Sequence, residues 1–443
     1  MGREAGTSPE PVSTFGPSGP LRGVLVPPPD KSISHRAALV AAMSEGPTVI
    51  RNYLDSADTR STLAAVAALG AVGPDLGERT LPAEFMIEGV GLHGPTGDVA
   101  IDVGNAGTLI RLLPGWLAGC DGRQWRLDGD SSIRSRPVDR IATPLREMGA
   151  VIEVTEDRFP PMDIYGSSLS GIEYELPVAS AQVKSCLLLA GLTAAGSTTV
   201  IEPIPTRNHT ELILRAAGAD IDTGPDRITI RGGSGLGLDQ VEVPGDLSSA
   251  AFFMTAAALI PGSELRIEQV GVNPTRMGLV SILRRMGADI SVETVGRSAG
   301  EELGTIEVRA AALSSVDVGG EEVPLAIDEL PLIALAAVFA EGTTRITGAA
   351  ELRVKESDRI AAVTEALGGL GARIESSEDG MVIEGTGRIG GGSVEAGGDH
   401  RMAMLGAVAG LLAEGPVEVF GMDAAAVSYP RFQLDLAGLL GGP

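Results

Sequence analysis

Hydrophobic and polar positions follow a pattern that repeats six times along the chain. In each copy a short polar turn opens an Ala- and Leu-rich apolar run, which closes at a glycine and is followed by a strand-like stretch. The six openings start at Pro29, Gly104, Ala179, Pro244, Ile327 and Gly398, and the closing glycines are Gly46, Gly119, Gly196, Gly262, Gly342 and Gly415. Self-similarity with a period of about 70 residues indicates six copies of one supersecondary unit.

The fifth copy shows what each unit contains. Residues 330–339 predict an apolar helix, residues 343–347 a strand, residues 360–370 an amphipathic helix and residues 373–375 another strand. The second helix of each unit closes at a glycine, as expected of a left-handed cap. These glycines are Gly70, Gly149, Gly218, Gly287, Gly371 and, in a degenerate copy, Gly441. Alternating strands and helices place the fold in the α/β class.

The first helix of each unit is apolar on nearly all sides, so it is expected to lie buried inside its domain. Six units divide into two halves of three, and the buried helices of each half are expected to run parallel. Two such halves facing each other enclose a cleft lined by six helix N-termini. Helix N-termini favour anions because unpaired N–H groups and the positive dipole end point at the ligand.

Charge and composition narrow the function. The 443 residues carry a formal charge of −24, which argues against binding nucleic acid or an anionic membrane surface. Cys120 and Cys186 lack metal-ligand spacing, which fits a reduced cytoplasmic protein. No apolar run is long enough to span a bilayer. Residues 1–20 are rich in Pro, Ser, Gly and Glu and predict a disordered tail without a signal pattern.

In so acidic a protein, the places where Lys and Arg gather are informative. Lys31, Ser32 and Arg36 open the first copy, and they fit either a capped charged turn or an anion pocket. Cations at a helix N-terminus oppose the dipole, so stability alone does not explain them, and the anion pocket is favoured. Residues 104–108 fit two interpretations equally well. They form either an ordinary structural turn or a ligand-binding turn whose glycines allow a ligand to approach the backbone.

Further charged positions lie at the ends of the units. They are Arg134, Arg136, Arg207, Asp328, Arg353, Lys355, Glu356, Asp358, Arg359 and Arg401. Surface ion pairs explain any one of them, and Asp328 fits a structural N-cap. Together, several separate cations indicate substrates with more than one anionic group, most simply phosphate and carboxylate. Asp328 and Glu356 are candidates for acid/base work among these cations. No phosphate-binding P-loop, dinucleotide fingerprint or zinc spacing is present.

Six stretches together resemble the 5-enolpyruvylshikimate-3-phosphate synthase family. They are residues 30–36, 104–108, 135–137, 179–185, 353–359 and 399–404, and they occur in family order from about Leu21 to the C-terminus. The resemblance implies a two-domain inside-out α/β barrel of six βαβαββ units, three per domain, with buried parallel helices. The crossovers are expected near Pro29 and Pro244. One domain then comprises residues 30–243, and the other residues 21–29 plus 244–443.

The resemblance also implies a reaction. The enolpyruvyl group of phosphoenolpyruvate is transferred to the 5-hydroxyl of shikimate 3-phosphate with release of phosphate, by addition and elimination through a tetrahedral intermediate. This step serves aromatic amino-acid biosynthesis in the shikimate pathway. It implies no metal or organic cofactor, no nucleic-acid or membrane partner, and a cytoplasmic monomer.

Site roles follow from the resemblance residue by residue. Shikimate 3-phosphate is expected to contact Lys31, Ser32, Arg36, Ser180, Gln182, Arg207, Asp328 and Lys355. Phosphoenolpyruvate is expected to contact Lys31, Gly107, Arg136, Gln182, Arg359 and Arg401. Asp328, Glu356, Lys31 and Lys355 are the expected catalytic residues: Asp328, helped by Lys355, takes the 5-hydroxyl proton, and Glu356 protonates the methylene carbon.

Two alternatives stay open, and one motif departs from the family. The sister enzymes that act on UDP-N-acetylglucosamine usually carry a reactive cysteine where this chain has Ser131. A non-catalytic anion-binding scaffold does not need Asp328 and Glu356 together with so many cations. Some relatives carry a lysine near the C-terminus that contacts phosphoenolpyruvate, where this chain has Val427 and Ser428.

Overall fold

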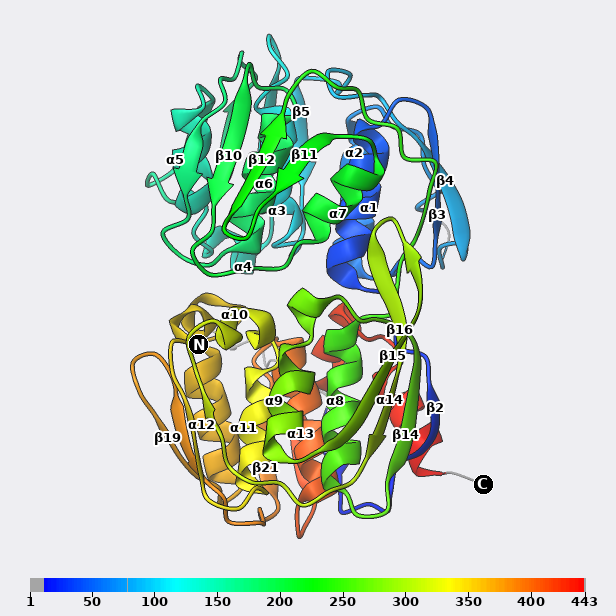
Figure 1. Ribbon diagram of the computed structural model, residues 1–443, viewed down its shortest axis with the longest axis vertical. Coiled ribbons are helices and arrows are strands. Elements are labelled where there is room, and N and C mark those ends of the chain that lie inside the picture. The colour runs from blue at the N-terminus through cyan, green and yellow to red at the C-terminus, as the bar shows by residue number, and fades with distance from the viewer. Residues whose placement is uncertain (1–11, 78, 442–443) are drawn as a thin grey trace, which may run out of the picture.

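The computed structural model describes residues 12–77 and 79–441 as a mixed α/β protein with two bodies stacked end to end (Figure 1). Buried apolar residues form two separate clusters. One extends from Ile33 to Val243, and the other from Leu247 to Leu439 with Leu21 and Leu25 added. We call the parts around these clusters the first body, at the top of Figure 1, and the second body.

The first body contains three sheets and seven helices among the described residues. Its strands are β3 (Pro47–Arg51), β4 (Glu84–Glu88), β5 (Val99–Asp102), β6 (Gln124–Asp128), β7 (Val151–Thr155), β8 (Phe159–Tyr165), β9 (Glu173–Glu175), β10 (Ser197–Ile201), β11 (Asp220–Thr223), β12 (Arg227–Arg231) and β13 (Gln240–Glu242). Its helices are α1 (Lys31–Met43), α2 (Ala57–Ala68), α3 (Leu109–Leu117), α4 (Ser131–Arg134), α5 (Asp139–Glu147), α6 (Ala181–Gly191) and α7 (His209–Ala216). The strand orders are β13-β3-β4, β5-β6-β8-β7 and β11-β12-β10-β9.

The second body also has three sheets in the described part of the chain. Its strands are β1 (Val12–Phe15), β2 (Arg22–Leu25), β14 (Glu264–Gly271), β15 (Asp289–Ser298), β16 (Glu301–Arg309), β17 (Asp317–Val318), β18 (Thr343–Ile346), β19 (Arg373–Ser376), β20 (Met381–Glu384), β21 (Gly392–Glu395) and β22 (Val417–Phe420). Its helices are α8 (Leu247–Leu259), α9 (Gly278–Met286), α10 (Glu322–Ala326), α11 (Leu330–Val338), α12 (Arg359–Gly369), α13 (His400–Leu412) and α14 (Phe432–Leu440), with 3-10 turns η1 (Pro274–Arg276), η2 (Ala350–Val354) and η3 (Met422–Val427). The strand orders are β15-β16-β14-β2, β17-β18-β20-β19 and β1-β22-β21.

The elements expected in the fifth copy are present within about a residue of their predicted bounds: α11, β18, α12 and β19. The Gly-Ala helix ends adopt left-handed backbone, with φ between 85° and 105° at Gly70, Gly149, Gly218, Gly287 and Gly371. An L side chain is strained at such a φ, which explains why glycine stands there.

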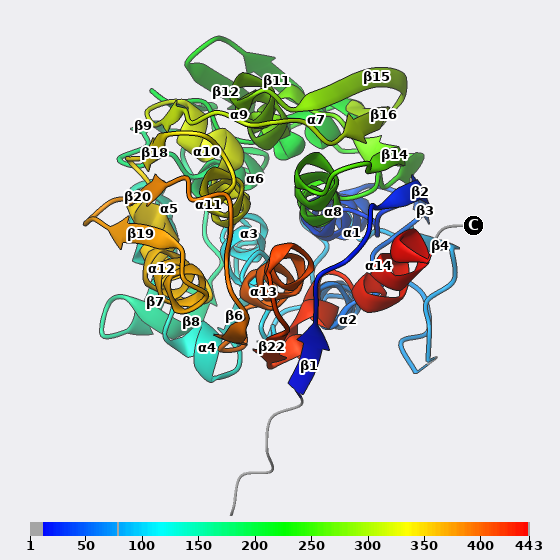
Figure 2. The ribbon, with the colours of Figure 1, turned by 90° about the horizontal axis from the view of Figure 1, so that it is seen from below.

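Six apolar helices form the cores of the two bodies, and Figure 2 shows them enclosed by the strands. They are α1, α3 and α6 in the first body and α8, α11 and α13 in the second. All nine residues of α11 are buried, which matches its uniformly apolar sequence. Small residues let the helices approach closely: a Cβ on Gly115 of α3 would lie 2.2 Å from the Cys186 carbonyl oxygen of α6.

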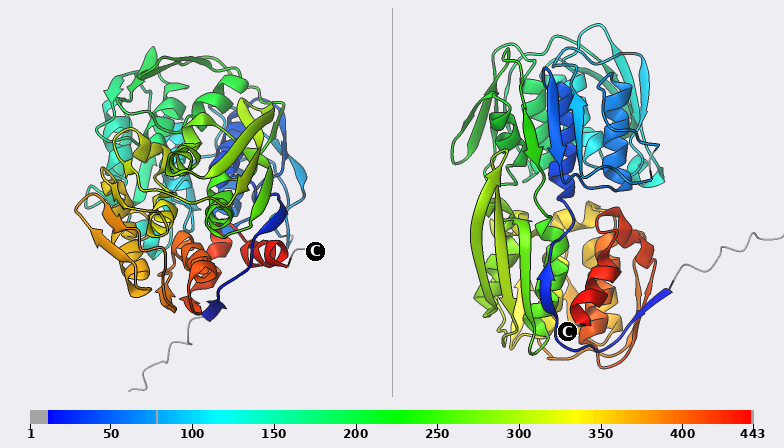
Figure 3. Two further views of the ribbon diagram at one scale, coloured as in Figure 1. Left: turned by 60° about the horizontal axis from the view of Figure 1, so that its bottom comes forward. Right: turned by 90° about the vertical axis from the view of Figure 1, so that its right-hand side faces the viewer.

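Two chain segments connect the bodies, and they run side by side. The Asp30 N–H donates to the Pro244 carbonyl at 2.8 Å, and the Asp246 N–H donates to the Pro28 carbonyl at 2.7 Å. The first segment reaches this crossing from β2, which pairs in parallel with β14 of the second body. Figure 3 shows this crossing on one side of the molecule.

The predicted disordered tail is wrong for residues 12–20, while residues 1–11 lie outside the described part. Strand β1 pairs antiparallel with β22, from Val12 opposite Phe420 to Phe15 opposite Val417. Phe15 packs on α13, where a Cβ on Gly410 would lie 2.6 Å from the Phe15 Cβ. A polar, Pro-rich composition hid this short strand, because its pairing partner lies some 400 residues away.

None of the helices in residues 12–77 and 79–441 has the length and hydropathy of a membrane span.

Candidate active site

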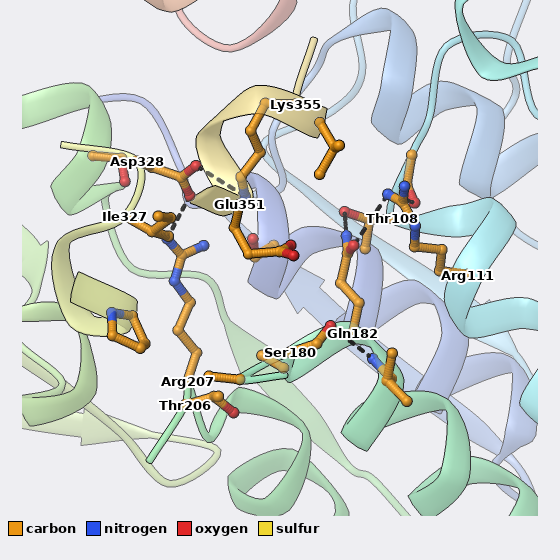
Figure 4. Close-up of a pocket in the computed structure, with 18 of the residues that line it drawn as sticks. Thr108, Arg111, Ser180, Gln182, Thr206, Arg207, Ile327, Asp328, Glu351 and Lys355 are labelled. Atoms are coloured by element: carbon orange, nitrogen blue, oxygen red, sulfur yellow. Dashed lines mark hydrogen bonds and ion pairs between the residues drawn. The ribbon is translucent and has the colours of Figure 1, made fainter. Parts of the chain in front are cut away.

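A cavity of about 500 Å³ lies between the two bodies (Figure 4). Residues from the first turns of α1, α3, α6, α8 and α13 line it, together with Asp328 just before α11. Aspartate and serine caps fix several of these helix starts: Asp30 accepts from the Ile33 N–H, and Asp399 accepts from the Arg401 N–H. The lining includes all thirteen site residues expected from the sequence: Lys31, Ser32, Arg36, Gly107, Arg136, Ser180, Gln182, Arg207, Asp328, Lys355, Glu356, Arg359 and Arg401.

Asp328, just before α11, is surrounded by cations from both bodies. The Arg207 guanidinium donates to its Oδ2 from the first body. From the second body, Arg359 Nη1 lies 3.2 Å and Lys355 Nζ 3.5 Å from its Oδ1, and Arg401 Nη2 lies 3.9 Å from its Oδ2. Figure 4 shows Asp328 between Lys355 and Arg207. Burial raises the pKa of Asp328, but these four cations lower it well below its usual value, so the carboxylate is ionised.

Glu356 is the second carboxylate of the cavity, and it also contacts both bodies. Its Oε2 lies 2.6 Å from Arg359 Nη2, and its Oε1 lies 3.5 Å from Nη1 of Arg136 in the first body. Burial raises the pKa of Glu356, while the guanidinium groups of Arg359 and Arg136 lower it well below its usual range. Arg359 is itself fixed by Asp399, whose Oδ2 lies 2.8 Å from Arg359 Nε. One guanidinium therefore bridges three carboxylates.

Lys355 and Lys31 differ in their surroundings. Burial lowers the pKa of the Lys355 ammonium, and the adjacent Asp328 opposes this shift. Lys31 Nζ pairs with Asp58 of α2 at 3.1 Å. Burial lowers the pKa of His400 to about 3, with Lys31 acting in the same direction, so this imidazole is neutral at physiological pH.

The turn that contains Gly107 leaves room for arginines. A Cβ on Gly107 would lie 2.8 Å from Arg136 Nη1 and 3.4 Å from Arg111 Nη1. Arg136 is oriented by its Nη2, which donates to Asn105 Oδ1 at 3.2 Å and to Ser132 Oγ at 3.1 Å. Glycine thus permits guanidinium groups to lie directly against the backbone at the start of α3.

Arg111 and Gln182 connect two helix starts. Arg111 Nη1 donates to Gln182 Oε1 at 3.1 Å, and Gln182 Nε2 donates to Thr108 Oγ1 at 3.4 Å (Figure 4). Burial lowers the pKa of Arg111 to about 10, which leaves it charged near neutrality. Ser180 caps α6 by accepting from the Val183 N–H.

Arg36 is fixed on the first-body side by hydroxyl and carbonyl oxygens. Its Nε donates to Thr210 Oγ1 at 2.7 Å, its Nη1 to the Ser32 carbonyl at 2.9 Å and its Nη2 to Ser185 Oγ at 3.0 Å. Burial lowers its pKa to about 10, so Arg36 remains cationic at neutral pH. Neutral partners leave its charge uncompensated at close range, which suits an anionic ligand.

The cavity reverses the sign of the protein's charge. Ten Lys and Arg side chains line it against five carboxylates, although the chain carries a formal charge of −24. A local excess of cations in a concave, partly buried space concentrates anions there.

Several lining residues were not expected from the sequence: Asp58, Arg111, Arg140, Arg276, Glu351 and His400. Two of them had a sequence signal: His400 lies in the stretch 399–404 that opens an apolar helix, and Arg111 lies one helical turn after Gly107. Two cations from the predicted clusters point elsewhere and do not line the cavity. Arg134 pairs with Asp128 at 2.6 Å, and Arg353 pairs with Asp358 at 2.6 Å.

No group of three or more His, Cys, Asp or Glu side chains suited to a metal ion occurs in the described residues.

Comparison with known proteins gives a consistent result. Residues 16–436 match the family model described as EPSP synthase (3-phosphoshikimate 1-carboxyvinyltransferase). A 3-phosphoshikimate 1-carboxyvinyltransferase from Synechococcus sp. (strain JA-3-3Ab) is 47% identical over 425 residues, 95% of each chain. The structure of EPSP synthase from Acinetobacter baumannii superposes with a TM-score of 0.85 at 43% identity, covering 97% of this chain and 98% of that one. The enolpyruvyl transferase NikO from Streptomyces tendae shares the fold, with a TM-score of 0.76 at 20% identity, covering 98% of each chain.

Proposed function

This chain belongs to the EPSP synthase family, and on that premise we propose that the cavity between its two bodies is where it transfers the enolpyruvyl group of phosphoenolpyruvate to shikimate 3-phosphate. The chain is therefore a transferase of the shikimate pathway. The observation that carries the placement is the Arg359 bridge. Its guanidinium lies 3.2 Å from Asp328 and 2.6 Å from Glu356, so two ionised carboxylates face one cation-rich cavity.

Shikimate 3-phosphate binds chiefly against the first body. Arg36 and Arg207 supply positive charge for its phosphate and carboxylate groups. Arg36 is free to do so because all its hydrogen-bond partners are neutral oxygens. Ser32, Ser180 and Gln182 add polar contacts at the helix starts. Asp328 and Lys355 reach from the second body toward the 5-hydroxyl, and Lys31 lies between the two substrates.

Phosphoenolpyruvate binds where Arg136 faces Arg359 and Arg401. Gly107 allows the substrate to approach the start of α3, and Gln182 borders the same space. Guanidinium groups pair with carboxylate and phosphate in bidentate geometry, which suits this substrate. Ser428 lines the cavity in the segment where some relatives carry a lysine, so the cationic contacts come from these arginines and Lys31.

The reaction proceeds by addition and then elimination. Asp328, kept ionised by its cations, accepts the 5-hydroxyl proton as the oxygen attacks C2 of phosphoenolpyruvate. Glu356, protonated once the substrates are bound, supplies a proton to the methylene carbon, giving a tetrahedral intermediate with a methyl group. Glu356 then takes a proton back from that methyl group while the C–O bond to phosphate breaks, and Asp328 passes the hydroxyl proton to the departing phosphate, so both carboxyl groups return to their starting states. The steps use only protein side chains.

Substrate binding prepares Glu356 for the first of these transfers. Arg359 and Arg136 now hold its pKa low. When the anionic groups of phosphoenolpyruvate engage the same guanidinium groups, the electrostatic stabilisation of the Glu356 carboxylate decreases, and its pKa rises. Exclusion of water from the cavity acts in the same direction.

Phosphate release tests the assignment. Purified protein mixed with shikimate 3-phosphate and phosphoenolpyruvate is expected to release phosphate and form the enolpyruvyl ether. UDP-N-acetylglucosamine in place of shikimate 3-phosphate is expected to give none. The reverse result favours the sister enzyme, and no release with either acceptor favours a binding scaffold.

The finer architecture belongs to the same proposal. We infer that each of the six sheets, with its helices, is one βαβαββ unit of an inside-out α/β barrel. The domains are residues 30–243 and, with strand β1 and residues 16–20 added to the range expected from the sequence, residues 12–29 plus 244–443. A monomer, a cytoplasmic location and an absence of nucleic-acid binding stay predictions, which light scattering, fractionation and a binding assay check.

A further inference from the structure

An ion pair outside the proposed chemistry joins the two bodies at the edge of the cavity. Arg140 Nη1 of α5, in the first body, lies 3.1 Å from Oε1 and 3.0 Å from Oε2 of Glu351, in η2 of the second body. The side chains are 29% and 38% exposed, so both are accessible and neither belongs to a buried core. One nitrogen contacts both carboxylate oxygens, so the carboxylate faces Arg140 symmetrically.

This pair lies far from the crossings that connect the bodies. In Figure 1, α5 is at the left of the first body, whereas β2, β14 and the crossing chain lie at the right. A contact at the edge opposite a hinge limits the opening angle more than a contact near the hinge, because it acts at a longer lever arm. The Arg140–Glu351 pair therefore restrains separation of the two bodies more than an ion pair of equal strength near the hinge would.

The partners are also close in sequence to residues of the proposed chemistry. Arg140 follows Arg136 by four residues, and Glu351 precedes Lys355 and Glu356 in the segment that leads out of η2. A second contact between the same two segments, Arg136 to Glu356, measures 3.5 Å. Closing the first pair thus holds Arg136 and Glu356 at a fixed spacing.

We propose that Arg140 and Glu351 form a latch that positions Arg136 against Glu356 by holding the two bodies together at the open edge of the cavity. They are positioning residues, since the proposed reacting atoms are held by other groups. The kinetic consequence rests on the proposed function, whereas the effect on the spacing of the bodies does not.

The test compares Arg140→Gln, Glu351→Gln, the double variant, and the charge exchange Arg140→Glu with Glu351→Arg. Each single variant is expected to lower kcat/KM for phosphoenolpyruvate by about two- to fivefold, in keeping with a partly exposed ion pair. The double variant is expected to lose no more than either single variant, because both remove one interaction. The charge exchange is expected to give a kcat/KM above that of the double variant and close to that of the unmodified protein, because it restores the ion pair.

A spin-label distance measurement reports the latch without catalysis. Val151 and Val382, at 52% and 37% exposure on the two bodies, accept labels after Val→Cys replacement, while the native Cys120 and Cys186 are buried. The glutamine variants are expected to give a longer and broader distance distribution, and the charge exchange to narrow it again.

Arg126→Gln is the matched control, because Arg126 contacts both oxygens of Asp163 within the first body, at 3.0 and 2.7 Å. Glutamine variants that match this control in both distance and kcat/KM overturn the latch, as does a charge exchange no better than the double glutamine variant. The protein could show no enolpyruvyl transfer while Arg140→Gln still lengthens the distance between the spin labels. That result would support the latch and contradict only the proposed function.

Discussion

Glu356 Oε1 lies 3.5 Å from Arg136 Nη1, although 220 residues separate them and they belong to different bodies. The contact aligns a proposed proton donor with a proposed phosphoenolpyruvate ligand. It exists only while the two bodies face each other, so binding and chemistry depend on the same arrangement.

Glu356→Gln is expected to lower turnover by about two to four orders of magnitude, the usual contribution of a positioned acid or base. Binding is expected to remain, since the amide keeps the shape and Arg136, Arg359 and Arg401 stay in place. Phosphate-release assays measure turnover, and calorimetry with shikimate 3-phosphate measures binding. Unchanged turnover would remove Glu356 from the mechanism.

Gly107→Ala is expected to raise the KM for phosphoenolpyruvate, by about tenfold if the displaced contact is worth about 1.4 kcal/mol. The new methyl group would lie 2.8 Å from Arg136 Nη1, so that guanidinium must shift. Affinity for shikimate 3-phosphate is expected to change little. Gly369→Ala is the control, because its Cβ has open space and its backbone is helical. Equal KM values in the two variants contradict the steric account.

Lys184→Met is expected to reduce the free energy of unfolding by about 3–5 kcal/mol, the range for breaking a buried ion pair. Lys184 is fully buried and lies 2.9 Å from Glu202 and 2.7 Å from Glu211, so its loss leaves two buried carboxylates without their ammonium. Urea unfolding measures the change. Adding Glu202→Gln and Glu211→Gln is expected to recover part of it, and a triple variant weaker than Lys184→Met argues against the electrostatic cause.

His35→Asn is expected to make stability less dependent on pH in mildly acidic solution. Burial lowers the pKa of His35 to about 3 from its ordinary value of 6.5. Between pH 6.5 and about pH 3, His35 binds a proton in the unfolded chain but not in the folded protein. The free energy of unfolding is therefore highest above pH 6.5 and falls as the pH drops below that value. The loss approaches about 1.4 kcal/mol per pH unit, the value for one proton.

Urea unfolding between pH 7.5 and about pH 4.5, well within the range where His35 differs from the unfolded chain, measures this slope. Asparagine retains a polar group near Thr62 Oγ1, which lies 2.6 Å from His35 Nδ1. His93 is exposed, so His93→Asn is expected to keep the slope of the unmodified protein. Equal slopes in the two variants contradict the assignment to His35.

Much of the architecture was predictable because local patterns determine it. The all-apolar run around Leu330 required a buried helix, and the Gly-Ala pairs required left-handed helix ends. Strand β1 was missed since four residues near a Pro-rich start carry little signal, and their pairing with β22 is a long-range event. The latch residues Arg140 and Glu351 were missed for the same reason: each alone reads as a charge on a polar surface.

The sequence by itself determined the repeated unit, the α/β class and the positions at which the core helices begin. It could do so because propensity, periodicity and capping act over a few positions. It also marked Lys31, whose charge opposes the helix dipole, and it singled out Asp328 and Glu356 as acid/base candidates because many cations accompany them. Only the tertiary structure decided which charges meet. Arg207 reaches Asp328, Arg136 reaches Glu356, and Arg134 turns away to Asp128. Those pairings depend on how two bodies face each other across a cavity, and Coulomb interactions act over ångströms in space rather than positions in sequence.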